Sequence, residues 1–225
     1  MQVLSLGETS FSGTIPDSIG NLKHLVSLTL HYANFSGRIP SSLGELSNLS
    51  LLRLTSNHFN GEVPSSFGNL KQLTSLTVEF NQLTGNFPSA LLNLTNLRLI
   101  RLDSNQFTGS LPPNMGQLSK LESFYASDNF FTGAIPLSLF QISSLTEIRL
   151  ENNQFSDISS KRETCSGAHR SCIAKCSAKS SMFFLHTKGF RIGTQLLLML
   201  CPYQMRAMDV SYDDLSSLFE TGGSK

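Results

Sequence analysis

The strongest constraint on the fold is a 24-residue period that fills the chain up to about residue 157. The motif Gly-x-apolar-Pro recurs, without an insertion, at Gly13, Gly37, Gly61, Gly85, Gly109 and Gly133. A fixed period of this length indicates stacked repeats that bury their apolar faces against one another. The sequence therefore predicts a solenoid of about seven coils over residues 1–156.

Each coil opens with a segment of the form Leu-x-x-Leu-x-Leu, such as Leu49, Leu52 and Leu54. Alternating apolar positions predict a short strand with one face in the core and the other in solvent. An apolar residue, usually Phe, follows five positions later, and the stacked rings should form an aromatic spine. These residues are Phe35, Phe59, Leu83, Phe107, Phe131 and Phe155. The Pro that follows ends the strand, and one helical or 3₁₀ turn closes the coil.

An Asn occurs at one phase of successive coils: Asn57, Asn81, Asn105, Asn129 and Asn153. A carboxamide offers two donors and an acceptor, so it can satisfy backbone groups in the turn that leaves each strand. We therefore expect a structural ladder of buried amides. Thr9 and Ala33 stand at the same phase, so the first two coils should be the looser ones.

The combined pattern LxxLxLxxNxFxGxIPxxLGxL, as in Leu49 through Leu70, resembles the plant-specific leucine-rich repeat class. That class builds the ectodomains of plant receptor kinases, receptor-like proteins and polygalacturonase inhibitors. The resemblance covers residues 1–156. It implies a right-handed α/β solenoid, with short parallel strands on a concave face and 3₁₀ or short helical turns opposite. The wording between the consensus positions is most similar to disease-resistance-type receptor-like proteins.

The chain departs from that family at its ends. Family members have a signal peptide, caps at both ends and usually a membrane span, and this sequence shows none of them. Met1 stands inside a coil, so we interpret the chain as a fragment or truncated product whose N-terminal cap is missing. Uncapped terminal coils expose apolar side chains. We expect this for Leu4, Leu6, Phe11, Ile15 and Ile19.

Residues 157–225 form a second region in which the period stops. Residues 1–156 carry eight Lys or Arg and ten Asp or Glu, whereas residues 157–225 carry nine and six, and all four Cys lie in this second region. We expect an irregular, poorly ordered tail. Cys165, His169, Cys172 and Cys176 superficially resemble a zinc site, but the spacing is weak and we expect no metal. A disulfide that involves Cys201 is an alternative.

The phase of the strands identifies outward side chains that a ligand could contact. Exposed aromatic and Arg residues are the usual composition of binding hot spots. The predicted ligand-binding residues on the concave face are Tyr32, Arg53, Phe80, Arg101, Asp103 and Tyr125. The alternative is that these charges merely pair on a solvated sheet, Arg101 with Asp103 and Glu79, and Arg149 with Glu147 and Glu151.

Three sequons are candidates for glycosylation: Asn34, Asn48 and Asn93. Asn48 and Asn93 fall on the turn side of their coils, where a glycan is tolerated. They fit an extracellular origin.

Catalytic motifs are absent from the sequence: no phosphate-binding Gly loop, kinase catalytic loop, Gly-x-Ser-x-Gly or His-Glu-x-x-His occurs. We therefore expect a non-enzyme without a cofactor that binds a peptide or protein ligand. The net charge of +1 gives no reason to expect a nucleic acid.

By resemblance, a membrane receptor kinase would be the co-receptor, in defence or developmental signalling at the outer face of the plasma membrane or in the cell wall. A secreted inhibitor of the polygalacturonase-inhibitor type, and a truncated product without its own function, are the alternatives.

Overall fold

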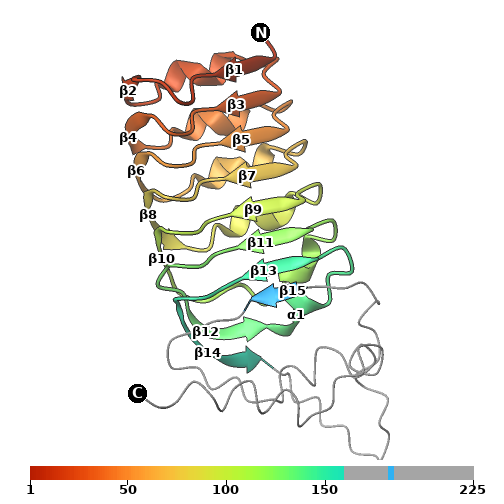
Figure 1. The fold of residues 1–225 in the computed structure, drawn as a ribbon. Helices are drawn as coiled ribbons and strands as arrows, with labels where there is room; N and C mark the ends of the chain where they lie inside the picture. Colours follow the sequence, from red (N-terminus) through yellow and green to blue (C-terminus); the bar gives the residue numbers. More distant parts are fainter. Residues whose placement is uncertain (160–181, 185–225) are drawn as a thin grey trace, which may run out of the picture. The chain divides into compact units, whose positions relative to one another are not determined.

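The computed structural model describes residues 1–159 and 182–184, and it shows the expected stack of coils (Figure 1). Each coil contributes one three-residue strand to a parallel sheet. Within the described residues this sheet has eight strands in the order β1-β3-β5-β7-β9-β11-β13-β15. Their bounds are β1 Val3–Ser5, β3 Ser27–Thr29, β5 Leu51–Arg53, β7 Ser75–Thr77, β9 Leu99–Arg101, β11 Ser123–Tyr125, β13 Glu147–Arg149 and β15 Met182–Phe184.

The 24-residue period fixes the register of this sheet from β1 to β13. Leu28 pairs with Leu52, which pairs with Leu76, and each pairing joins residues one period apart. These three side chains are fully buried, whereas their neighbours along each strand point out of the core. The predicted alternation of core and solvent positions is therefore confirmed.

A second set of parallel strands, which the sequence pattern did not reveal, forms along one side of the coils. In the described part these are the sheet β10-β8-β6-β4-β2 and the pair β12-β14. Their bounds are β2 Ser12–Gly13, β4 Asn34–Arg38, β6 His58–Gly61, β8 Gln82–Asn86, β10 Gln106–Thr108, β12 Thr132–Pro136 and β14 Gln154–Ser159. Apart from β14, where Asp157 stands at that phase, these strands contain the Gly of the Gly-x-apolar-Pro motif or stop just before it. That residue has a positive φ, for example +71° at Gly61, a conformation that Gly adopts without steric cost.

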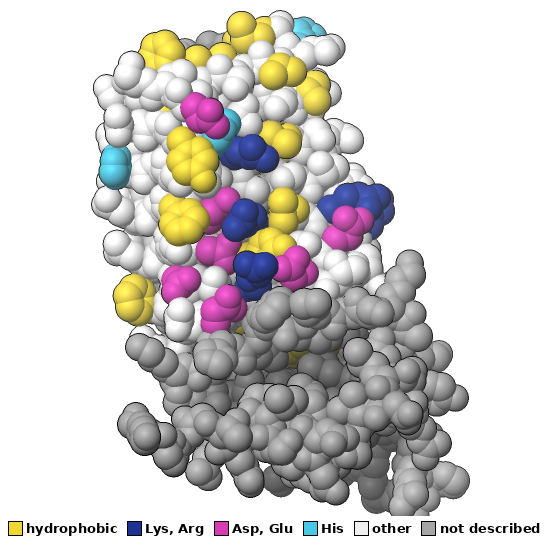
Figure 2. All heavy atoms as spheres, viewed as in Figure 1, with side chains coloured by type: hydrophobic (Ala, Val, Ile, Leu, Met, Phe, Trp, Pro, Cys, Tyr) yellow, Lys and Arg dark blue, Asp and Glu magenta, His cyan; other side chains and the backbone are white. Residues whose placement is uncertain are grey.

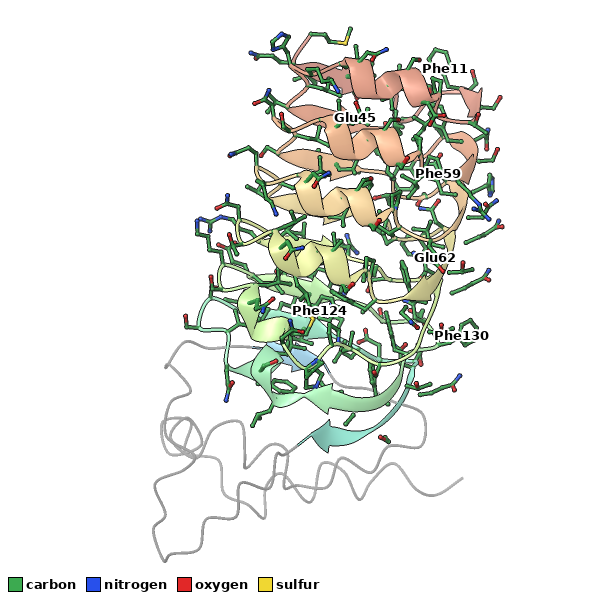
Figure 3. The ribbon with its side chains drawn as sticks, turned by 180° about the vertical axis from the view of Figure 1, so that it is seen from behind. Phe11, Glu45, Phe59, Glu62, Phe124 and Phe130 are labelled. Carbon is green, nitrogen blue, oxygen red and sulfur yellow. The ribbon has the colours of Figure 1, made fainter. Side chains whose placement is uncertain are left out.

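Short helical turns lie on the side opposite the first sheet, as expected (Figure 3). They are η1 Asp17–Asn21, η2 Ser41–Glu45, η3 Ser65–Asn69, η4 Ser89–Asn93, η5 Met115–Gln117 and α1 Leu137–Phe140. In most of them a Pro with extended backbone stands just before the first residue, as Pro40 does before η2. The ring fixes φ, and the lost N–H is one that a helix start leaves unpaired anyway.

The aromatic spine is present but interrupted. Phe35 stacks on Phe59 with ring centroids 6.4 Å apart, and Phe107, Phe131 and Phe155 stack in the same way at 5.9 and 6.1 Å. Leu83 separates the two groups and is itself fully buried. The core is thus continuous through the coils, and one position of the spine is aliphatic.

The N-terminal coil is better buried than the sequence suggested. Ile15 and Ile19 are buried, because the next coil covers them, and Leu4 and Leu6 are partly buried against the core. Only Phe11 of the five expected residues is strongly exposed, at 55%.

At the other end of the described residues, β14 continues to Ser159 and β15 pairs with β13. The sequence did not predict β15. The Cys and His residues of the zinc-like pattern, and Cys201, lie outside the described residues. Among the residues that are described, no helix has the length and apolar character that crossing a bilayer requires.

Candidate ligand-binding surface

The outward side of the strands β1 to β13, together with the turn that follows each strand, forms a surface that we call the strand face. Successive coils place equivalent side chains about 4.8 Å apart on it. Figure 2 shows Asp, Glu, Lys and Arg side chains gathered over these strands, with hydrophobic side chains beside them. All six predicted ligand-binding residues lie on the strand face or at its edge, but they differ in exposure and in partners.

The third residue after the end of each of these strands has an unusual backbone. In the described part of the chain, seven non-glycine residues have positive φ, and all stand at this phase: Glu8, Tyr32, Ser56, Phe80, Ser104, Asp128 and Asn152. The turn keeps its inter-coil bonds, since the backbone N–H of Tyr32 donates to Thr55 and that of Phe80 donates to Asp103. A left-handed conformation costs a residue with a side chain roughly 1–2 kcal/mol.

Tyr32 and Phe80 are the two aromatic residues at this phase, with φ of 50° and 57°. Their side chains are 60% and 53% exposed, so neither is needed to fill the core. They stand two coils apart with the small Ser56 between them. Together with Ala33, Asn34, Asn57 and His58 these residues line a shallow hollow of about 460 Å³.

The part of the strand face next to the hollow carries buried charge. Glu79 and Asp103 occupy the same outward position on adjacent coils, and their side chains are only 5% and 8% exposed. The guanidinium of Arg101 lies 3.3 Å from Glu79 and 3.5 Å from Asp103. The hydroxyl and the backbone N–H of Ser127 donate to Asp103 at 2.8 and 3.3 Å. Burial raises the pKa of the Asp103 carboxyl, although these hydrogen bonds and Arg101 act in the opposite direction.

Tyr125 lies between two guanidiniums. Arg101 stands 5.1 Å from the centre of its ring and Arg149 stands 5.0 Å away, both at cation–π distance. The Tyr125 hydroxyl donates to Glu147 at 2.5 Å, and Glu147 also accepts from Arg149 at 2.8 Å. These contacts, above all the Tyr125 hydroxyl, hold the pKa of Glu147 below its usual range. Burial and the bond to Glu147 raise the pKa of Tyr125.

Arg53 is exposed and, among the residues that the structure describes, has no ion-pair partner. It differs in this from Arg101, which two carboxylates hold in place. Asp103 differs from the other predicted residues because it is buried, so it acts through Arg101 and Ser127. Sequence reasoning treated Glu79 and Glu147 only as pairing partners. Their phase already placed them on this face, but their burial and shared contacts depend on neighbouring coils.

The five phase-specific Asn residues lie inside the turns. The side-chain N–H groups of Asn105 donate to Val78 in the preceding coil at 3.0 Å, and to Leu102 and Asp103 in its own coil at 3.1 Å. Its side-chain oxygen accepts from the backbone N–H of Leu83 at 2.9 Å. Asn57, Asn81, Asn129 and Asn153 make equivalent bonds. These residues join successive coils and leave the strand face free.

The three sequons are exposed but differ in place. Asn34 begins β4 and lines the hollow beside Tyr32. Asn48 donates its side-chain amide to the carbonyl of Lys23 at 2.8 Å, and Asn93 ends η4. In the residues that the structure describes, no group of three or more His, Cys, Asp or Glu is arranged to hold a metal ion.

Comparison with known proteins places the coils in a family. The family described as leucine-rich repeat region matches residues 1–161. A search of curated proteins found no match.

Several solved structures resemble the chain. The plant peptide hormone receptor RGFR1 in complex with RGF2 is 41% identical, with a TM-score of 0.68 over 68% of this chain and 25% of that one. The complex PEPR1-AtPEP1 is 36% identical, with a TM-score of 0.66 over 69% and 22%. The Arabidopsis receptor kinase HAESA, in complex with the peptide hormone IDA and the co-receptor SERK1, is 30% identical, with a TM-score of 0.66 over 67% and 25%. The chain thus spans about a quarter of each of these structures.

Proposed function

The chain belongs to the leucine-rich repeat family, with repeats of the plant receptor type, and from this premise we propose that its strand face binds a peptide or a segment of a protein. The similar structures include a peptide hormone receptor in complex with RGF2 and a receptor kinase in complex with a peptide hormone and a co-receptor. By this similarity the partners would be a plant- or pathogen-derived peptide and a receptor kinase that supplies signalling, and the module would act outside the cell.

The observation that carries the proposal is the pair Tyr32 and Phe80. Both side chains are more than half exposed, and both stand in the left-handed backbone region that disfavours residues with a Cβ. Folding gains little from an aromatic ring at such a position, since Ser56 and Ser104 occupy the same phase in other coils. Binding gains from it, because exposed aromatic side chains are typical anchors of interfaces.

The remaining predicted residues supply polar contacts around this anchor. Arg53 presents an exposed guanidinium that can fork onto a carboxylate or a backbone carbonyl of a ligand. Arg101 and Tyr125 are already held by ion pairs and by stacking, so little side-chain entropy is lost when a ligand contacts them.

The test is a selection of binders from a phage-displayed library of random dodecapeptides against the full chain. We expect binders that Phe80→Ser weakens about tenfold or more, since hot-spot side chains contribute upward of 1–2 kcal/mol. The matched control is Phe130→Ser, because Phe130 is equally exposed, at 50%, but lies beyond the hollow, further along the stack (Figure 3). Binders whose affinity changes with neither substitution would contradict the proposal.

A further inference from the structure

The strand face is divided by charge. In its last four coils five carboxylates, Glu79, Asp103, Asp128, Glu147 and Glu151, face two guanidiniums, Arg101 and Arg149. No Asp, Glu, Lys or Arg is among the residues that line the Tyr32–Phe80 hollow, and Glu79, which directly precedes Phe80, is buried. The face therefore has an apolar part and, next to it, a part with an excess of negative charge.

Part of this negative charge is buried and incompletely paired. Glu79 and Asp103 are adjacent like charges, and both approach the single guanidinium of Arg101. Asp103 Oδ2 faces the Nε of Arg101 at 3.5 Å as an ion pair, whereas Glu79 Oε2 and Glu151 Oε2 are shielded from solvent and accept no hydrogen bond. A buried acceptor without a donor is destabilising. Glu79 Oε2 therefore favours a further donor that carries positive charge.

We propose that the strand face selects a peptide with a basic side chain, Lys or Arg, which sits against Glu79 and Asp103 while an apolar side chain occupies the hollow between Tyr32 and Phe80. This inference rests on the proposed function and adds the chemistry of the ligand. Complementary charge is the main source of specificity at such a surface. An ammonium or guanidinium supplies a donor for Glu79 Oε2, and its charge offsets the excess of two carboxylates over the single guanidinium of Arg101.

The two subsites set the spacing of the ligand. The centre of the hollow lies at the coil of Ser56, and the carboxylate pair is centred one and a half coils further along the stack. At about 4.8 Å per coil this separation is roughly 7 Å. An extended peptide advances about 3.3 Å per residue, so the apolar and basic residues should stand two or three positions apart in a peptide that runs across the strands.

The dodecapeptide binders described above test this chemistry. We expect them to share an aromatic or aliphatic residue two or three positions from a Lys or Arg. Replacing that basic residue by Gln should weaken binding to the native chain about tenfold, because charge-assisted hydrogen bonds contribute roughly 1.5–3 kcal/mol. Against the Glu79→Gln/Asp103→Asn double variant the same replacement should change affinity less than about twofold. Glu62→Gln, on an exposed side turn (Figure 3), is the matched control.

The outcomes separate the two proposals. Binders that Phe80→Ser weakens but that show no preference for a basic residue, or that prefer an acidic one, would overturn this inference and leave the recognition role standing. No binders, or binders indifferent to Phe80→Ser, would remove both. The replacement within the peptide leaves the protein unchanged, so a double variant that fails to fold does not prevent a decision.

Discussion

Asn57 holds Phe35 in the coil before it, because its side-chain oxygen accepts a hydrogen bond of 3.0 Å from the backbone N–H of Phe35. Its side-chain N–H groups donate to Leu30 in that same preceding coil at 2.6 Å, and to two carbonyls of its own coil at 3.1 Å. One side chain thus satisfies backbone groups on both sides of an inter-coil contact, where water has little access.

Asn57→Ala should lower the free energy of unfolding by roughly 3 kcal/mol, because it leaves at least one buried donor and one buried acceptor without partners. Urea denaturation measures this loss. The control is Asn60→Ala, an exposed residue on the side strand β6, for which we expect a change within about 0.5 kcal/mol. Equal losses at the two positions would mean that the ladder does not hold the coils together.

Thr9 partly replaces a ladder residue that the second coil lacks. Ala33 stands where Asn57 stands one coil later, so the carbonyl of Leu6 and the N–H of Phe11 have no carboxamide to bond. The hydroxyl of Thr9 donates to Leu6 at 2.7 Å and accepts from Phe11 at 3.4 Å. The sequence predicted looser coils here, and the hydroxyl supplies shorter-range bonds in place of the inter-coil ones.

Ala33→Asn should therefore stabilise the chain by about 1 kcal/mol, the net contribution of a typical hydrogen bond. Thr9→Val should cost about 1 kcal/mol in the native chain and much less in the Ala33→Asn background, because the introduced carboxamide would serve the same two groups. A double-mutant cycle followed by urea denaturation measures this coupling. Additive effects would show that the two positions do not share these bonds.

The contributions of Asp103 and Glu147 to folding stability should change in opposite directions as the pH falls. Burial raises the pKa of Asp103 above its usual 3.8, so the folded chain holds this proton at a pH where the unfolded chain has lost it. Its contribution to stability is therefore greatest below about pH 3.8 and falls as pH rises through the raised pKa. The pKa of Glu147 is lowered from 4.5, so its contribution is present above pH 4.5 and is lost as pH falls through the lowered value.

Two isosteric substitutions isolate these effects. Relative to the native chain, Asp103→Asn should lose part of the stability that acidification provides. Glu147→Gln should instead lose stability near neutral pH, and the difference should shrink as the pH falls through the lowered pKa of Glu147. Unfolding free energies measured by urea denaturation across this acidic range, with Glu62→Gln as an exposed control, give both differences. If the unfolding free energies of the two variants changed with pH by the same amount, the directions assigned to the pKa shifts of Asp103 and Glu147 would be wrong.

The sequence predicted the coil because a coil is local: its strand, spine residue, Asn and Pro all follow from one 24-residue pattern. It did not predict the side strands β4, β6 and β8, because their pairing depends on how neighbouring coils bend around a Gly with positive φ. It placed Tyr32, Phe80 and Arg101 on the outward face from phase alone.

Exposure and pairing on that face were harder to predict. Arg101 and Asp103 were foreseen as neighbours, yet the burial of Asp103 depends on side chains from the coils on either side, Ser127 among them. The hollow beside Phe80 likewise arises because the intervening coil has a small residue, Ser56, at the same phase. Neither the burial of Asp103 nor the hollow can be inferred from a single repeat, since each depends on side chains from three successive coils.

Phe80 offers a test in which stability and binding should separate. Its φ of 57° is strained for an aromatic residue, whereas Asn tolerates this region and already occupies it at Asn152. Phe80→Asn should raise the free energy of unfolding by up to about 1 kcal/mol, while it weakens peptide binders about tenfold. Urea denaturation measures the first quantity and titration with a selected peptide measures the second.

The control for this pair of effects is Phe130→Asn, which removes an equally exposed ring from a position without positive φ. For this variant the free energy of unfolding should not rise, and the affinity for the peptide should not fall. Tyr32→Asn should follow Phe80→Asn but gain less stability, because the Tyr32 ring also contacts His31 edge-on at 5.6 Å. If Phe80→Asn instead destabilises the chain, the ring serves the fold. Its exposure would then no longer argue for recognition, since a side chain that stabilises the turn needs no ligand to account for it.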